Sequence, residues 1–221
     1  MNGPNGSRHP ALSDTLVHFT SRAAPRADLP GAIANMSPDQ RLEEIIRGER
    51  IQGFSTYWSC RPVVCMSESR DEDITHLLTD RGWQPWGLFF SAADVARVGG
   101  GPVWYARSEQ WDQVRGMDPA VAADLGQWIV RWDVGPQRPS DWRHEREWRI
   151  PGAVLDLRVV QPVGVLVGDP SWQFRANDDL VPGRLGNYPQ DWIPGYPPGW
   201  LSGLARWCWN RDSLQLVRLG P

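Results

Sequence analysis

Residues 144–150, His-Glu-Arg-Glu-Trp-Arg-Ile, place two carboxylates, three basic side chains and a Trp within seven positions. A β-strand alternates its side chains between two faces and rises about 3.3 Å per residue. As a strand, this segment is expected to hold Glu145 and Glu147 on one face, about 7 Å apart, and His144, Arg146 and Trp148 on the other. Two carboxylates at that distance repel by about 2 kcal/mol at an effective dielectric constant near 20. Such a pair suits a cleft or a cationic ligand, and the alternative is a solvated edge strand with surface ion pairs.

Other familiar catalytic or binding patterns fail on spacing. Trp148 stands where a zinc-binding H-E-x-x-H helix needs its second His. The glycines at 99–101 are not followed by the Lys-Ser/Thr of a phosphate-binding loop. Cys60, Cys65 and Cys208 form no C-x-x-C pair, and their odd number does not suit a disulfide framework. We therefore expect no metal site.

Composition indicates a globular protein with ordinary bulk charge. The chain has 221 residues and a formal net charge of −3, so its overall charge does not advertise a nucleic-acid or anionic-membrane partner. Its 14 Trp, 22 Gly and 20 Pro predict many turns between short elements. The polar residues 1–10 lack the apolar core of a signal peptide, and no apolar run approaches a membrane span. We therefore expect a cytoplasmic protein.

The elements that must position these residues are short. One helix has strong end signals: Ser37 as N-cap, Pro38 in the first turn, Gln40 at the capping-box position and Gly48 as the expected terminator. Further helices are predicted over 71–79, in one turn after Ser91, and over 119–126. Strands are predicted over 15–20, 62–67, 86–91, 103–106, 128–133, 144–150, 159–167 (interrupted by Pro162) and 214–219.

Several short strands with few helices indicate an α+β domain. We expect residues 1–14 to be a flexible lead-in and 15–168 to form the domain. Residues 169–221 are expected to form an extension packed on it, mostly a loop layer rich in Trp, Pro and Gly.

Four short segments occur in a familiar order: Val-His-Phe-Thr at 17–20, Ile-Ile-Arg-Gly at 45–48, Gly-Pro-Val-Trp-Tyr at 101–105 and Arg-Glu-Trp-Arg-Ile-Pro at 146–151. With them the chain resembles the AbiGi-type abortive-infection family. More distantly it is similar to the DNA-ADP-ribosylating toxin DarT and the His-Tyr-Glu branch of the ADP-ribosyltransferase superfamily. The resemblance implies an ADP-ribosyltransferase-like core, with a split, mixed or antiparallel sheet, over 15–168.

The resemblance also implies roles toward NAD as substrate. Glu147 would bind the 2′-hydroxyl of the nicotinamide ribose and stabilise the oxocarbenium ion that forms as nicotinamide leaves. Glu145 would orient the acceptor, and Tyr105 would stack on the nicotinamide. Without the resemblance, Tyr105 is a strand aromatic like its neighbour Trp104.

At the other end of the implied site, His18 would bond the NAD ribose with Thr20 beside it. Arg61 is the nearest counterpart of an additional arginine in DarT-like enzymes. A His in an apolar strand is otherwise more often a satisfied core residue.

Three functions remain open at this stage. The first is an NAD-dependent mono-ADP-ribosyltransferase, acting as a toxin or phage-defence effector on a nucleic acid or a protein, with a cognate toxin or antitoxin as partner. The second is a non-catalytic, antitoxin-like member of the same fold. The third is a Trp-rich ligand-binding module. Convergence of His18, Tyr105 and Glu147 on one cleft would favour the first, whereas Glu147 buried in a core away from His18, or on the far face of the sheet, would be grounds for dropping it.

Overall fold

The structure is a computed structural model that describes residues 13–20, 31–55, 61–68, 71–133, 141–174 and 198–219. Most of the expected flexible lead-in, residues 1–12, lies outside this described part. Ser13 is tied to the domain, because its backbone N–H donates to Oε1 of Glu68 at 2.9 Å.

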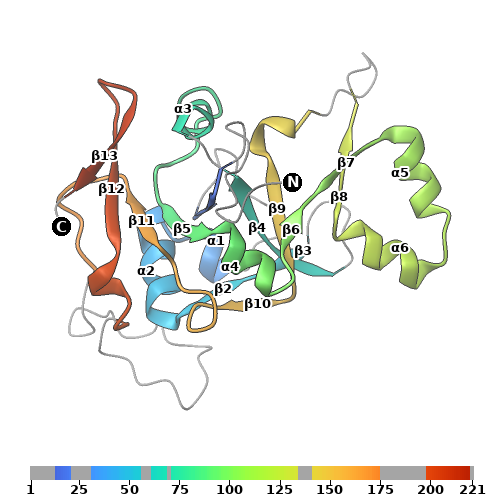
Figure 1. The fold of residues 1–221 in the computed structure, drawn as a ribbon, viewed down its shortest axis with the longest axis horizontal. Coiled ribbons are helices and arrows are strands. Elements are labelled where there is room, and N and C mark those ends of the chain that lie inside the picture. Colours follow the sequence, from blue (N-terminus) through green and yellow to red (C-terminus); the bar gives the residue numbers. More distant parts are fainter. Residues whose placement is uncertain are drawn as a thin grey trace, which may run out of the picture.

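The described elements form an α+β fold around a nine-stranded mixed sheet (Figure 1). Its order is β13-β12-β11-β5-β1-β4-β9-β6, with β3 paired to β4; the β11–β12 pair is parallel and the other neighbours are antiparallel. The bounds are β1 Thr15–Phe19, β3 Phe54–Ser55, β4 Pro62–Glu68, β5 Gly87–Ser91, β6 Gly101–Pro102, β9 Glu147–Pro151, β11 Gly164–Val167, β12 Ala205–Asn210 and β13 Gln215–Leu219. The expected α+β class with few helices and a mixed sheet is confirmed.

Two smaller sheets and several short helices complete the described part. The small sheets pair β2 (Arg50–Gln52) with β10 (Val154–Asp156), and β7 (Trp104–Arg107) with β8 (Ile129–Trp132). The helices are α1 Gly31–Ala34, α2 Pro38–Gly48, α3 Asp71–Thr79, α4 Ala92–Arg97, α5 Ser108–Arg115, α6 Pro119–Gly126, and the 3₁₀ turns η1 Arg143–Glu145 and η3 Leu201–Gly203. None of the described helices is long and apolar enough to cross a membrane.

Each face of the main sheet has its own hydrophobic core, as strand alternation requires. On one face, Leu42 and Ile46 of α2 join Leu16, Met66 and Trp148 in one core cluster, here called the α2 core. The opposite face buries a second cluster, here called the α3 core, which is contributed by β1, α3, Trp83, β5, β11 and β12. Its members are Val17, Ile74, Leu77, Leu78, Trp83, Phe89, Leu166 and Trp209.

The pairing of β1 with β4 in this continuous sheet is short. Strand β1 pairs with β5 along all five of its residues, but it pairs with β4 only at Leu16–Glu68 and Val17–Ser67. At the next position the His18 ring contacts β4, with Nδ1 2.9 Å from the Cys65 carbonyl oxygen. Because a carbonyl can only accept, that nitrogen carries the proton.

Residues 104–132, here called the lobe, comprise β7, α5, α6 and β8 and project from one end of the sheet (Figure 1). The lobe has its own small core of Ala106, Trp111, Val114 and Ile129. Asp118 caps α6 by accepting the Ala120 N–H at 2.9 Å. Helix α6 matches its predicted range, whereas α5 was not predicted.

Helix α2 confirms the strongest helix prediction, with one change at its end. The Gln40 side chain accepts the Ser37 N–H at 3.1 Å, and Pro38 begins the helix. The expected role of Gly48 as terminator is wrong: Gly48 is still helical, and Glu49 takes the left-handed conformation with φ 48°.

Three other predictions of elements are wrong. Strand β9 begins at Glu147 rather than at 144, because η1 occupies 143–145 and Arg146 is left-handed with φ 44°. Residues 159–160 form a turn, so β11 begins only at Gly164. Residues 205–210 are strand β12 rather than loop, because β11 offers them a parallel partner.

Candidate functional site

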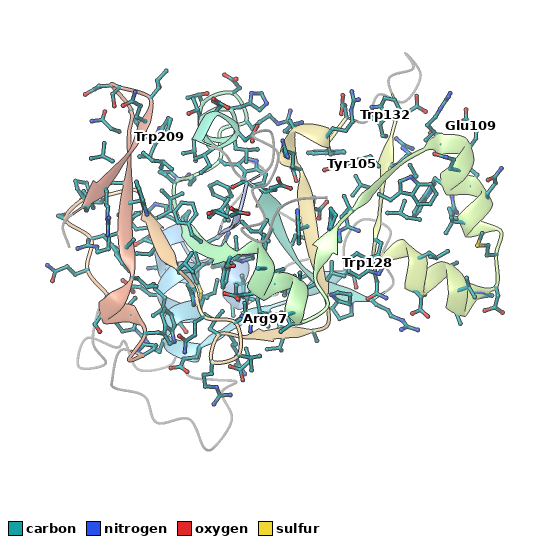
Figure 2. The ribbon with its side chains drawn as sticks, viewed as in Figure 1. Arg97, Tyr105, Glu109, Trp128, Trp132 and Trp209 are labelled. Atoms are coloured by element: carbon teal, nitrogen blue, oxygen red, sulfur yellow. The ribbon has the colours of Figure 1, made fainter. Side chains whose placement is uncertain are left out.

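The start of β9 meets the lobe at Glu147. The backbone N–H of Glu147 donates to the Tyr105 hydroxyl at 2.9 Å, across 42 positions of sequence. The Glu147 carbonyl accepts the N–H of Val103, just before the lobe, at 3.0 Å. The side chain of Tyr105 therefore extends from β7 of the lobe to the start of β9 (Figure 2).

Glu145 joins this junction from η1. It is only 2% exposed, and its charge, like that of Glu147, acts on Tyr105. Burial raises the pKa of Tyr105 well above its ordinary value of 10.0; the N–H of Glu147 opposes this shift, and the charges of Glu147 and Glu145 add to it. The phenol consequently keeps its proton. The strand geometry expected for the two carboxylates is wrong, because a 3₁₀ turn and a left-handed residue separate Glu145 from β9.

Arg149, which the sequence interpretation missed, binds the Glu147 carboxylate through both ends of its fork. Its Nε lies 2.9 Å from Oε1 and its Nη2 lies 3.2 Å from Oε2, with the side chains 5% and 7% exposed. Burial alone would lower the pKa of Arg149, but the adjacent Glu147 raises it above the ordinary value, so the guanidinium stays charged. The i, i+2 spacing could have indicated this pair, since it places both residues on one strand face.

The third guanidinium nitrogen of Arg149, Nη1, reaches the lobe. Its Nη1 donates to the carbonyls of Gln127 at 2.9 Å and Ile129 at 3.2 Å, with Gly126 at 3.5 Å. These carbonyls lie at the end of α6 and the start of β8. Arg149 thus connects the candidate carboxylate with the backbone of the lobe.

Strand β4 contributes two more polar side chains to this face. Ser67 is 4% exposed and stands directly opposite Glu147 in the β4–β9 register. Cys65 stands opposite Arg149, and its side chain interacts with that guanidinium. Neither was a candidate from sequence, because no motif marks them and only the register brings them to Glu147.

Glu68 fixes the start of β9 from the other face. Its Oε1 accepts from Arg146 at 2.8 Å, and its Oε2 accepts the indole N–H of Trp148 at 3.1 Å. Trp148 lies in the α2 core, which confirms the prediction that it points away from Glu147. This carboxylate, also missed from sequence, binds the side chain of Arg146, whose backbone is left-handed with φ 44°.

His18 does not join the Glu147 group. Alternation along β1 places it on the face of Leu16, whereas Val17 shares its face with Ser67 and Glu147. The expectation that His18, Tyr105 and Glu147 surround one pocket is therefore wrong for His18. Its ring lies beside β4 instead, at the Cys65 carbonyl.

The other two candidates also lie elsewhere. The Thr20 hydroxyl donates to the carbonyls of Pro38, at 2.8 Å, and Trp86, at 3.2 Å, so it ties the end of β1 to α2 and the segment before β5. Arg61 precedes β4 at the end remote from Glu147 and forms an exposed ion pair with Asp124 of α6, at 2.6 Å.

A cluster of rings borders the junction where α3 packs against η1. The rings of His144 and His76 lie edge to face with centroids 5.4 Å apart, and the Arg81 guanidinium lies over Trp142 at 5.3 Å. Burial, reinforced by the charges of Arg81 and His76, lowers the pKa of His144 below 6.5. No set of three or more His, Cys, Asp and Glu side chains that could hold a metal occurs among the described residues.

Comparisons with known proteins do not identify the chain. No family model matches it, and neither the curated proteins nor the solved structures include a significant match. The class supported so far is an α+β protein with a buried, charged junction at Tyr105, Glu145, Glu147 and Arg149.

Proposed function

We propose that this chain is an NAD-dependent mono-ADP-ribosyltransferase of the ADP-ribosyltransferase fold, acting as a bacterial toxin or phage-defence effector. The observation that carries the proposal is the meeting of Tyr105, Glu145 and Glu147 at the start of β9. These residues come from separate elements, and all three belong to the set that the family resemblance implies. The short pairing of β1 with β4, at Leu16–Glu68 and Val17–Ser67 alone, supports the same fold.

In this proposal each residue has one role. The Glu147 carboxylate stabilises positive charge at C1′ of the nicotinamide ribose as the C–N bond breaks and its electron pair leaves with nicotinamide. An acceptor nucleophile then bonds to C1′, and Glu145 takes its proton. Tyr105 provides a ring surface for the nicotinamide. The acceptor is a macromolecule, a nucleic acid or a protein.

The test is nicotinamide release from NAD by native protein and by matched variants. Glu147→Gln removes the charge, and we expect release per folded molecule to fall by about 10²–10³. Glu147→Asp keeps the charge and the pairing with Arg149 but retracts the carboxylate, and we expect a smaller loss of about tenfold. Glu145→Gln should retain hydrolysis of NAD and lose transfer to an acceptor.

Thermal melts of each variant separate loss of chemistry from loss of fold. Arg158→Lys, a surface substitution in a residue paired with Asp156, is the activity control. Native protein that releases no nicotinamide with any nucleic-acid or protein acceptor, or Glu147→Gln with native activity, would contradict the proposal.

A second candidate is a non-catalytic, antitoxin-like protein of the same fold. Two observations favour it: Arg149 occupies both oxygens of Glu147, and Glu147 is buried on the sheet face opposite His18. The second observation is the arrangement that counts against a transferase on the expectations drawn from the sequence. In this case Glu147 is a structural carboxylate. Calorimetry separates the candidates, because the second predicts that native protein binds no NAD.

A further inference from the structure

The lobe meets the main sheet at Glu147 of β9, and it is also tied to the rest of the protein by the Arg61–Asp124 ion pair and by the Arg143 guanidinium over the Trp132 ring. Glu147 bonds Tyr105 of the lobe through its N–H and Val103, next to the lobe, through its carbonyl. Its carboxylate is held by Arg149, whose other arm bonds carbonyls of the lobe. In Figure 1 the lobe projects beyond the sheet edge, and its core is separate from the two cores of the sheet.

We propose that Arg149 is a positioning residue that couples the position of the lobe to the orientation of the Glu147 carboxylate. The catalytic consequence of this inference rests on the proposed function, whereas the coupling between the lobe and the Glu147 carboxylate does not. One guanidinium donates to the carboxylate through Nε and Nη2 and to the lobe through Nη1. Because a guanidinium is planar and rigid, movement of the lobe carbonyls turns the face presented to Glu147.

Burial makes this coupling strong. Arg149 and Glu147 are 4% and 6% exposed, so water cannot replace a lost bond to either side chain. A macromolecule that binds the lobe and shifts α6 against β9 would therefore change how Glu147 is held. This gives the proposed site a means of regulation by an acceptor or partner on the lobe.

The structural half is tested by amide hydrogen exchange. Arg149→Lys keeps a positive charge beside Glu147 but cannot bond the carboxylate and the lobe carbonyls together. We expect amides of residues 104–132 to exchange at least about tenfold faster than in native protein. Arg47→Lys, an equal change in a buried arginine of α2 paired with Glu44, should leave lobe exchange unchanged. Equal exchange in native protein and Arg149→Lys, or equal acceleration in both variants, would overturn the coupling.

The catalytic half is tested by steady-state kinetics of nicotinamide release. Arg149→Lys should lower kcat by about tenfold or more while KM for NAD changes less than about twofold, since only the orientation of Glu147 is altered. Tyr105→Phe combined with Arg149→Lys should give a non-additive loss, because both residues hold Glu147. If Arg149→Lys keeps the native kcat although the amides of its lobe exchange faster, the positioning role is overturned. If native protein releases no nicotinamide, the proposed function fails while hydrogen exchange still decides the coupling.

Discussion

The central feature at the residue scale is a carboxylate that is buried and fully engaged. Glu147 is held by Arg149 at its side chain and by Tyr105 at its backbone. Replacing one member of a buried ion pair strands the other charge away from water, which typically costs 3–5 kcal/mol. Catalytic and structural roles of Glu147 therefore have to be separated by experiment.

Glu147→Gln should lower the free energy of unfolding by about 3–5 kcal/mol, because Arg149 keeps its charge at a site only 4% exposed. The double replacement Glu147→Leu with Arg149→Met removes both charges and should recover much of that loss. Urea denaturation of these two variants and of native protein measures this. A double variant as unstable as Glu147→Gln would show that the hydrogen bonds to the lobe, rather than the charges, dominate.

Tyr105 should remain protonated well above pH 10, because burial and the two neighbouring carboxylates disfavour phenolate. Because the pKa of Tyr105 is raised in the folded state, the contribution of this residue to folding stability is fully present below pH 10. That contribution is lost as the pH rises further. Native protein and Tyr105→Phe should therefore show the same tyrosinate absorbance up to about pH 11. Loss of about a quarter of the signal in Tyr105→Phe, one of four tyrosines, would place Tyr105 in water instead.

At the element scale, the turn η1 and helix α3 together set the approach to β9. His144 on η1 packs against His76 of α3, and the carboxylate of Asp80 bonds His76 Nδ1 at 2.7 Å. The next residue of η1 after His144 is Glu145. Protonation of His144 therefore places a positive charge on the residue next to Glu145.

The pKa of His144 is lowered in the folded state, so its neutral form supports folding above about pH 6.5 and that support is lost as the pH falls below 6.5. The facing groups are His76, Arg81 and Asp141, of which the two bases oppose the imidazolium and the acid favours it. When the pH is lowered from about 7.5 to 5.5, the melting temperature of His144→Gln should fall less than that of native protein. Parallel melting curves for the two proteins would contradict this.

At the scale of the whole molecule, the lobe and the C-terminal hairpin β12–β13 lie at opposite ends of one sheet (Figure 1). The hairpin completes the sheet rather than covering it. Leu204 and Cys208 belong to the α2 core, and Trp209 belongs to the α3 core.

A chain truncated after Gly168 should fail to fold cooperatively, because it exposes the edge of β11 and removes residues from both cores of the sheet. Thermal unfolding followed by circular dichroism measures this. A truncated chain that melts sharply near the native temperature would show that the C-terminal residues are a dispensable extension.

The sequence by itself determined the elements whose signals are local. The Ser37 to Gln40 pattern predicted the start of α2, Asp118-Pro119 began α6, and apolar runs located β1, β4 and β5. Alternation also predicted that Trp148 and Glu147 face opposite ways. These features depend on capping and on the period of a strand, which neighbouring residues fix.

Only the tertiary structure decided how those elements meet. The 3₁₀ turn η1 and the left-handed Arg146, which pairs with Glu68, precede β9, so Glu145 lies outside the strand that its spacing suggested. Strand order placed His18 away from Glu147. Arg149 gained its role from lobe carbonyls about 20 positions earlier, and β12 became a strand because β11 was beside it. Register and long-range hydrogen bonds arise between segments distant in sequence, so no local pattern records them.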